Sequence, residues 1–235
     1  MDVSLLLIIL LVGAIATFLS GDKWASKTAL VFSLAAFGAS LYLLSLYNAG
    51  QNINFIARWI SVPNISLSFK ADGLALALVL LTTALTPLIL FSSFGNSYDK
   101  SRNFYGLVML MVFAMAGTFL SDDGFLYYIF WEIALIPIYF IALIWGNGNP
   151  QSRRKAVVKF FIYTFAGSLF MLVSFIYLYL RAGSFLWADL TSVELTAREQ
   201  FWIFLGFFMA YAIKIPLIPF HTLQAKIKKK APAVG

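Results

Sequence analysis

Seven long runs of hydrophobic residues, separated by shorter polar segments, dominate the pattern along this chain of 235 residues. A helix that spans a bilayer needs about twenty predominantly apolar residues. The pattern therefore predicts helices over residues 3–19, 25–46, 73–94, 104–120, 125–145, 157–180 and 201–223. Because most connections are short, successive helices are expected to run antiparallel. The predicted fold class is all-α, a polytopic transmembrane bundle of about seven spans that forms one membrane domain over residues 1–235.

Lysine and arginine are distributed unevenly between the two ends of these spans. The connections after spans one, three, five and seven hold twelve of them, whereas the opposite side holds only four. Because cytoplasmic loops carry an excess of Lys and Arg, this count places the N-terminus outside and the basic stretch Lys226–Lys230 in the cytoplasm.

The connection over residues 49–72 is expected to be an external loop or a short β-hairpin. Hydrophobic residues alternate on both sides of a Val-Pro-Asn sequence at 62–64, which favours two short strands joined by a turn. Asp72 follows and directly precedes the third span. A carboxylate at that position is expected to cap the free N–H groups of the helix.

Composition narrows the classes of function. The chain is 61% hydrophobic and 11% charged, with a mean hydropathy of +0.87, which excludes a water-soluble domain as its main part. It contains no cysteine, so it cannot build a disulfide, a thiolate metal site or an iron–sulfur cluster. The basic residues that give the net charge of +7 cluster in the loops between spans, as expected for residues that set membrane topology. It does not indicate nucleic-acid binding.

Glu132 is the most unexpected residue of the fifth span. It lies in an otherwise uncharged run of 21 residues, about 4.5 Å along the helix axis from the middle of the run. An ionised side chain at that depth costs at least about 2.5–3.5 kcal/mol, so such residues face the bundle interior and usually mark ion pathways. The alternative is a structural polar contact between helices.

Lys214 lies even closer to the middle of the seventh span and is followed by Pro216 and Pro219. Each proline removes a backbone donor and clashes with the carbonyl four residues earlier. The seventh span is therefore expected to be broken near Lys214 to Pro219, which is tolerated where the backbone lines a cavity or is buried in protein. A kink that serves packing alone would explain the prolines but not the lysine. Glu132 and Lys214 are expected to face each other as a pair that opens and closes.

Two further ionisable residues are candidates for the same path. His221 could extend a proton path toward the cytoplasm, because histidine titrates near neutral pH, or it could be an interfacial hydrogen-bonding residue. Lys159 lies near the cytoplasmic start of the sixth span and could either reach the surface or turn toward Glu132. The surface orientation of Lys159 is favoured slightly.

Several segments of the chain match sequence motifs of a known family. Trp131-Glu132 followed by Ile136-Pro137 resembles the fifth helix of the antiporter-like subunits of respiratory complex I, and within them of the M-type chain. Three other segments resemble the sixth helix, the broken seventh helix and the start of the third helix of that family: KFFIYTFAGS at 159–168, AIKIPLIPFHT at 212–222 and FKADGLALALVLLT at 69–82.

The resemblance implies a role for the charged residues. Glu132 corresponds to the essential glutamate of the family, Lys214 to its pumping lysine, and His221 to the histidine that follows. The implied function is that of a proton-translocating membrane subunit of NADH:quinone oxidoreductase. Such a chain carries out no redox chemistry and binds no cofactor itself, because NADH, flavin, iron–sulfur clusters and quinone are bound by partner subunits.

The resemblance also implies a context for the chain. The partners would be the lipid bilayer and other membrane subunits of complex I, including neighbouring antiporter-like subunits, in the bacterial inner membrane. The family fold has fourteen helices, so this sequence would be its N-terminal half, a fragment or a shortened chain, and is not expected to translocate ions alone. It departs from the family at Leu223, where a tryptophan is usual, and in the basic stretch Lys226–Lys230.

Three alternatives remain open at this point. A Na⁺(K⁺)/H⁺ antiporter subunit uses the same helices and the same glutamate–lysine pair. A truncated scaffold subunit without transport is a second possibility. A retinal protein also has seven spans and a mid-membrane lysine in the seventh, but it needs a carboxylate counter-ion in the third span, which has no charge after Asp72.

Overall fold

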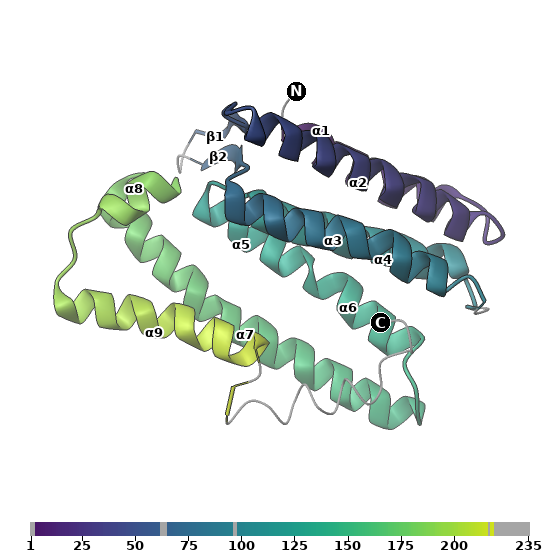
Figure 1. The fold of residues 1–235 in the computed structure, drawn as a ribbon. Helices are drawn as coiled ribbons and strands as arrows, with labels where there is room; N and C mark the ends of the chain where they lie inside the picture. The colour runs from purple at the N-terminus through teal and green to yellow at the C-terminus, as the bar shows by residue number, and fades with distance from the viewer. Residues whose placement is uncertain (1–2, 62–64, 96–97, 216, 219–235) are drawn as a thin grey trace.

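The computed structural model describes residues 3–61, 65–95, 98–215 and 217–218 as a helical bundle with one small hairpin (Figure 1). The helices are α1 (Ser4–Leu19), α2 (Ala25–Asn48), α3 (Gly73–Ser92), α4 (Ser101–Leu120), α5 (Gly124–Ile133), α6 (Leu135–Ile144), α7 (Pro150–Ala182), α8 (Trp187–Ser192) and α9 (Ala197–Lys214). The strands are β1 (Asn54–Ile60) and β2 (Ile65–Lys70).

The prediction of an all-α polytopic bundle is confirmed. Among the described residues, five helical segments are long and apolar enough to cross a bilayer: α2, α3, α4, α5 together with α6, and α7. The remaining two predicted spans correspond to α1, a shorter apolar helix, and to α9. α9 differs from the five because its 18 residues include three charged ones, Arg198, Glu199 and Lys214.

The fifth predicted span is not one continuous helix. It is divided at Ala134 into α5 and α6, immediately after Glu132 and Ile133 (Figure 1). Pro137 explains the division, because its ring clashes with the carbonyl of residue 133 and it has no N–H to donate there. The predicted span over 125–145 is confirmed as one membrane-crossing segment over Gly124–Ile144, with an interruption at Ala134 that was not predicted although the sequence contains the proline that explains it.

The seventh predicted span ends at Lys214, so the predicted break begins where it was expected. The N–H of Leu217 donates to the carbonyl of Ala212 at 2.9 Å, which replaces the bond that a proline at 216 cannot make. Leu217 and Ile218 are not helical. Pro219, His221 and the basic stretch Lys226–Lys230 lie outside the described residues.

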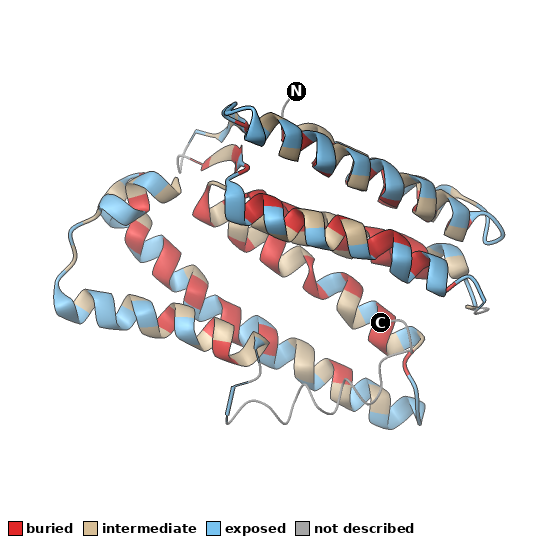
Figure 2. Ribbon diagram, in the orientation of Figure 1, coloured by how far each residue is buried: buried red, intermediate tan, exposed pale blue. Residues whose placement is uncertain are grey.

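Two clusters of buried side chains form the interior. The larger joins α1, α2, α3, α4, α5 and α6, and the smaller joins α5, α7, α8 and α9. Buried residues follow the facing sides of the helices, whereas the outward face of α2 and much of α9 are exposed (Figure 2). Many of the exposed residues are large and apolar, such as Val31, Leu88 and Phe204, which suits a surface in contact with lipid.

The hairpin lies against the loop between α4 and α5. β1 and β2 pair antiparallel, with Phe55 opposite Phe69, and Phe69 also forms an isolated bridge with Ser121. Asp72 caps α3, accepting a hydrogen bond from the N–H of Ala75 at 2.8 Å, as predicted. Asp123 caps α5 in the same way through the N–H groups of residues 125 and 126. The two carboxylates therefore fix the starts of both helices at one end of the bundle.

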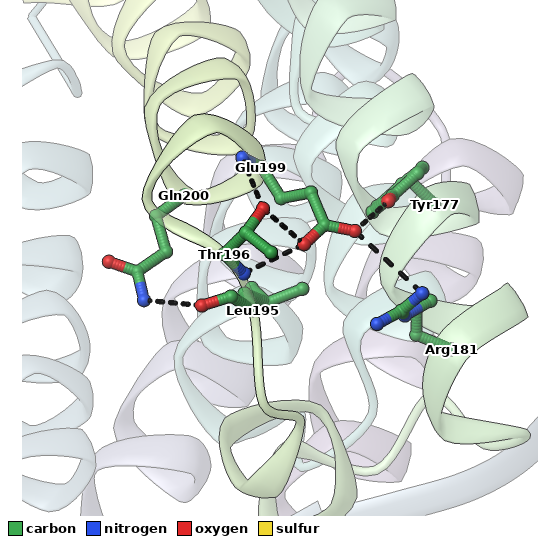
Figure 3. A network of polar contacts seen from close by, with 6 residues as sticks. All are labelled: Tyr177, Arg181, Leu195, Thr196, Glu199 and Gln200. Atoms are coloured by element: carbon green, nitrogen blue, oxygen red, sulfur yellow. Dashed lines mark hydrogen bonds and ion pairs between the residues drawn. The ribbon is translucent and has the colours of Figure 1, made fainter.

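A polar cluster ties the start of α9 to the end of α7 (Figure 3). Thr196 and Glu199 form a capping box, in which the Glu199 carboxylate accepts from the backbone N–H of Thr196. The same carboxylate accepts from the Tyr177 hydroxyl and lies 3.7 Å from an Arg181 nitrogen. Because Tyr177 and Arg181 belong to α7, the cluster sets the position from which α9 descends along α7.

Glycine at position 206 allows α7 and α9 to pack closely. A Cβ atom there would lie 2.8 Å from the carbonyl oxygen of Phe170 and would overlap the Ser174 hydroxyl. Gly206→Ala is expected to destabilise the protein by about 1–3 kcal/mol, because the backbone oxygen cannot move aside. Thermal unfolding in detergent micelles measures the change.

Gly38, in the interior of α2, provides the matched control. No atom lies within 4 Å of a Cβ built at this position. Gly38→Ala should be neutral or stabilising by up to about 1 kcal/mol, since alanine favours the helix. Equal unfolding temperatures for the two variants would contradict the close packing of α7 and α9.

Candidate functional site

Glu132 lies in the last turn of α5, directly before the helix is broken. Its side chain is half-buried, and one carboxylate oxygen, Oε1, is buried without a hydrogen-bond partner among the described residues. Ser168 of α7 and Tyr128 of α5 lie beside the carboxyl group. An unpaired buried carboxylate oxygen is costly, so this position is one that can gain a proton or a new partner.

Lys214 is the last residue of α9, and its ammonium group meets α5. The Nζ atom lies 3.5 Å from the centroid of the Trp131 ring, one residue before Glu132. The charges of Lys214 and Glu132 also interact electrostatically. A desolvated cation over an indole face is stabilised by about 2 kcal/mol. The structure therefore brings the two predicted residues to one place, with Trp131 as an additional partner of the lysine.

Aromatic side chains add two further contacts between α5 and α9. The hydroxyl groups of Tyr127 and Tyr211 are hydrogen-bonded at 3.0 Å, and either one can be the donor. The Trp131 ring meets the Tyr211 ring edge to face, with centroids 5.4 Å apart. Tyr127 and Trp131 lie four residues apart on α5, and Tyr211 and Lys214 lie three apart on α9. These spacings place each pair on one helix face.

α7 contributes small residues beside the charged pair. A Cβ at Gly167 would lie 2.6 Å from the Cδ1 atom of Ile213, the residue before Lys214. The neighbouring Ser168 and Thr164 are buried, and their hydroxyls donate to carbonyls of their own helix at 2.8 Å. α7 can therefore approach both α5 and α9 closely at the level of the charges.

Of the other two predicted residues, only Lys159 lies in the part of the chain that the structure describes. Lys159 is exposed on α7, with its Nζ atom 5.4 Å from the centroid of the Tyr163 ring and the basic residues Arg154 and Lys155 nearby. Its exposure is compatible with the surface orientation favoured from the sequence. His221 lies beyond the part of the chain that the structure describes.

The loop before α5 carries two carboxylates outside the spans. Asp122 lies near Lys70 and Asp72, and burial raises the pKa of Asp122, an effect that Lys70 partly offsets. Burial also raises the pKa of Asp123, and the backbone N–H groups that its carboxylate accepts counteract the rise. Both carboxylates therefore hold their protons more tightly than an exposed aspartate does.

Sequence reasoning missed two functional candidates, the partnership of Trp131 with Lys214 and the hydroxyl pair formed by Tyr127 and Tyr211. The helical spacing was a usable signal for both. Tyr127 and Trp131 lie one turn apart on the helix of Glu132, and Tyr211 lies one turn before Lys214. No spacing along the chain, however, shows that these two faces meet.

Comparison with known proteins identifies relatives of this chain. The family described as NADH:quinone oxidoreductase/Mrp antiporter, TM, matches residues 121–235. Subunit M of F(420)H(2) dehydrogenase from Methanosarcina mazei is 31% identical over 99% of this chain and 49% of its own length. NADH-quinone oxidoreductase subunit M from Rickettsia prowazekii is 34% identical over 91% of this chain and 44% of its own length. The chain thus spans about half the length of these curated relatives.

Solved structures share the fold. A chain of respiratory complex I from Thermus thermophilus superposes with a TM-score of 0.84 at 27% identity, over 97% of this chain and 47% of that one. A chain of the Mrp complex from Dietzia sp. superposes with a TM-score of 0.85 at 18% identity, over 97% of this chain and 25% of that one, which shows a shared fold alone. The chain is thus similar in sequence and in fold to antiporter-like membrane subunits of NADH:quinone oxidoreductases and Mrp antiporters, and the two curated relatives named above are M subunits.

Proposed function

We propose that this chain is part of a proton-translocating M-type subunit of NADH:quinone oxidoreductase. The observation that carries the proposal is the meeting of Lys214 with Trp131 and Glu132 at the contact of α5 and α9, where α9 ends at Lys214 and α5 ends directly after Glu132 and Ile133. Sequence similarity supports the same function, because two of the relatives are named NADH-quinone oxidoreductase subunit M. The proposed site residues are Glu132 and Lys214, with His221 as a third.

The two charges form a switch of sufficient size. At an assumed separation of about 5 Å and an effective dielectric of about 20, a carboxylate and an ammonium attract each other by about 3.3 kcal/mol. Moving a proton against about 150 mV requires roughly 3.5 kcal/mol. Separating Glu132 from Lys214 would therefore change the proton affinity of the lysine by about the amount that pumping requires. The carboxylate oxygen without a partner and the irregular backbone beside both residues allow such a separation.

The proposal assigns the electron transfer to other chains. NADH, flavin, iron–sulfur clusters and quinone would be bound by partner subunits, and their reaction would drive a movement that reaches α5 and α9. The partners would be neighbouring membrane subunits, including other antiporter-like ones, and the bilayer. The location would be the bacterial inner membrane, with the N-terminus and the hairpin outside.

A Na⁺(K⁺)/H⁺ antiporter subunit is the alternative, because the family description that matches residues 121–235 also names the Mrp antiporter. The relatives named above favour the oxidoreductase subunit instead. Proton uptake that is independent of Na⁺ and K⁺, and that a protonophore abolishes, would separate the two functions. Dependence of the pH gradient on either cation would favour the antiporter.

Glu132→Gln and Lys214→Ala, made in the intact complex, are each expected to lower the rate of proton pumping by tenfold or more. Each removes one partner of the switch, and about 1.4 kcal/mol corresponds to a factor of ten in rate. Proteoliposomes containing a pH-sensitive dye measure pumping during NADH oxidation. Glu194→Gln, which changes an exposed loop carboxylate, is the control and should pump normally. Pumping at the wild-type rate in either site variant, with the complex assembled, would refute the proposed function.

Trp131 gives an independent test through the position of the ammonium group. Trp131→Leu removes the ring face and should lower pumping by about 2- to 30-fold, corresponding to roughly 0.5–2 kcal/mol of cation–π stabilisation. Trp131→Phe keeps a ring and should retain much more activity. If leucine and phenylalanine were equally active, the contact of Lys214 with the ring would have no part in translocation.

A further inference from the structure

The first turns of α7 carry three exposed cations on one side of the helix: Arg154, Lys155 and Lys159, called here the cation cluster. They line one hollow together with Ile162 and Tyr163, the next residues on the same face. The Nζ atom of Lys159 lies 5.4 Å from the centroid of the Tyr163 ring. The cation cluster lies at the end of the bundle opposite the hairpin, where α7 begins (Figure 1).

No negative charge of the described chain balances the cation cluster. The sequence has no aspartate or glutamate between Glu132 and Asp189, and the first turn of α7 contains no acidic residue. Among the described residues, none of the three cations forms an ion pair with a carboxylate. Like charges so close together repel one another. An anion bound at this place would therefore relieve an electrostatic cost that the described chain leaves uncompensated.

The same face of α7 continues toward the middle of the bilayer as an apolar surface. Ile162, Leu169, Phe170 and Val173 follow the cation cluster at helical spacing and form an apolar stripe, with exposed fractions from 40% to 65%. Val173 lies eleven residues after Ile162, which is a rise of about 16.5 Å. One leaflet of a bilayer has a hydrocarbon depth of about 15 Å. The apolar stripe therefore has the length of the acyl chains of one leaflet.

The start of α4 shows that basic residues at this end of the bundle do not all have this surrounding. Lys100 and Arg102 lie there, and the carbonyl of the neighbouring Asp99 accepts a hydrogen bond from the indole of Trp145, shortly before α7. The next turns of α4, however, are buried over residues 104–109. Basic residues that only set topology need no lipid-facing surface beneath them. α7 offers both a cation cluster and an apolar stripe, which suits a ligand that is charged at one end and apolar along its length.

We propose that the cation cluster binds the phosphate of one anionic phospholipid, whose acyl chains lie along the apolar stripe of α7. Arg154 and Lys155 contact the phosphate from the surface side, and Lys159 lies one turn deeper, about 6 Å further along the helix axis. A zwitterionic lipid carries its own ammonium group, which the cation cluster repels, so the site selects an anionic headgroup. The inference uses the membrane environment of α7 and does not depend on proton translocation.

Photoactivatable lipids test the site in the intact complex that contains this chain. Phosphatidylglycerol and phosphatidylcholine, each with a diazirine in one acyl chain, are compared in nanodiscs, and labelled peptides are identified by mass spectrometry. A Lys or Arg near the surface contributes a factor of about five toward anionic lipid. Phosphatidylglycerol should therefore label residues 162–173 about tenfold or more above phosphatidylcholine, and unlabelled phosphatidylglycerol should compete.

Two results of this comparison would overturn the proposal. Equal labelling by the two lipids would show that the apolar stripe is ordinary lipid-exposed surface without selection for a headgroup. Absence of labelling by either lipid would show that a protein segment covers this face in the complex, so that the cation cluster meets a partner subunit and no lipid.

Charge variants test whether the cation cluster is the cause of the selection. Arg154→Gln combined with Lys155→Gln should lower the affinity for phosphatidylglycerol, measured by competition, by about 20-fold, since two factors of about five are lost. Lys23→Gln combined with Lys27→Gln is the matched control, because it removes two exposed cations from the connection between α1 and α2 and should leave the affinity unchanged.

A charge-preserving exchange separates lipid binding from a defect in folding. Arg154→Lys combined with Lys155→Arg keeps both charges and should bind phosphatidylglycerol like the wild type, with equal amounts of assembled complex on a native gel. Equal loss of affinity in the glutamine variant and its control would assign the effect to overall surface charge and overturn the proposal. Unchanged affinity in an assembled glutamine variant would also overturn it.

Discussion

A lysine ammonium inside an apolar bundle is the constraint on which the rest of this structure depends. The group cannot remain charged in hydrocarbon without partners, and here the ring of Trp131 and the carboxylate of Glu132 supply them from a different helix. The attraction between charges explains why α5 and α9 must meet at this level. The hydrogen bond between the hydroxyls of Tyr127 and Tyr211 adds a polar contact between the same two helices.

The backbone supports this arrangement by being irregular beside both charges. Pro137 divides the fifth span just after Glu132, and the seventh span ends at Lys214. A helix end leaves carbonyl groups that can accept hydrogen bonds, and it permits small movements that a continuous helix resists. Gly167 and Gly206 let α7 pack closely against α9, which holds the frame around the charged residues.

The hairpin end of the bundle is built differently from the site. There, carboxylates are fixed by backbone N–H groups, as Asp72 fixes the start of α3 and Asp123 that of α5. The hairpin strand β2 adds backbone contacts to the same loop, where the N–H of Asp122 donates to the carbonyl of Ser68 at 2.8 Å.

The sequence by itself determined the membrane environment, the positions of the helices, the cap at Asp72 and the two residues whose burial is costly, because hydropathy, capping and the cost of buried charge are local properties of the chain. It also contained the proline that divides the fifth span, although that break was not predicted. The tertiary structure alone decided that Trp131 receives the Lys214 ammonium and that Tyr127 meets Tyr211. The physical reason is that helical periodicity shows which residues share a face, whereas the partner of that face depends on how distant helices rotate and pack against one another.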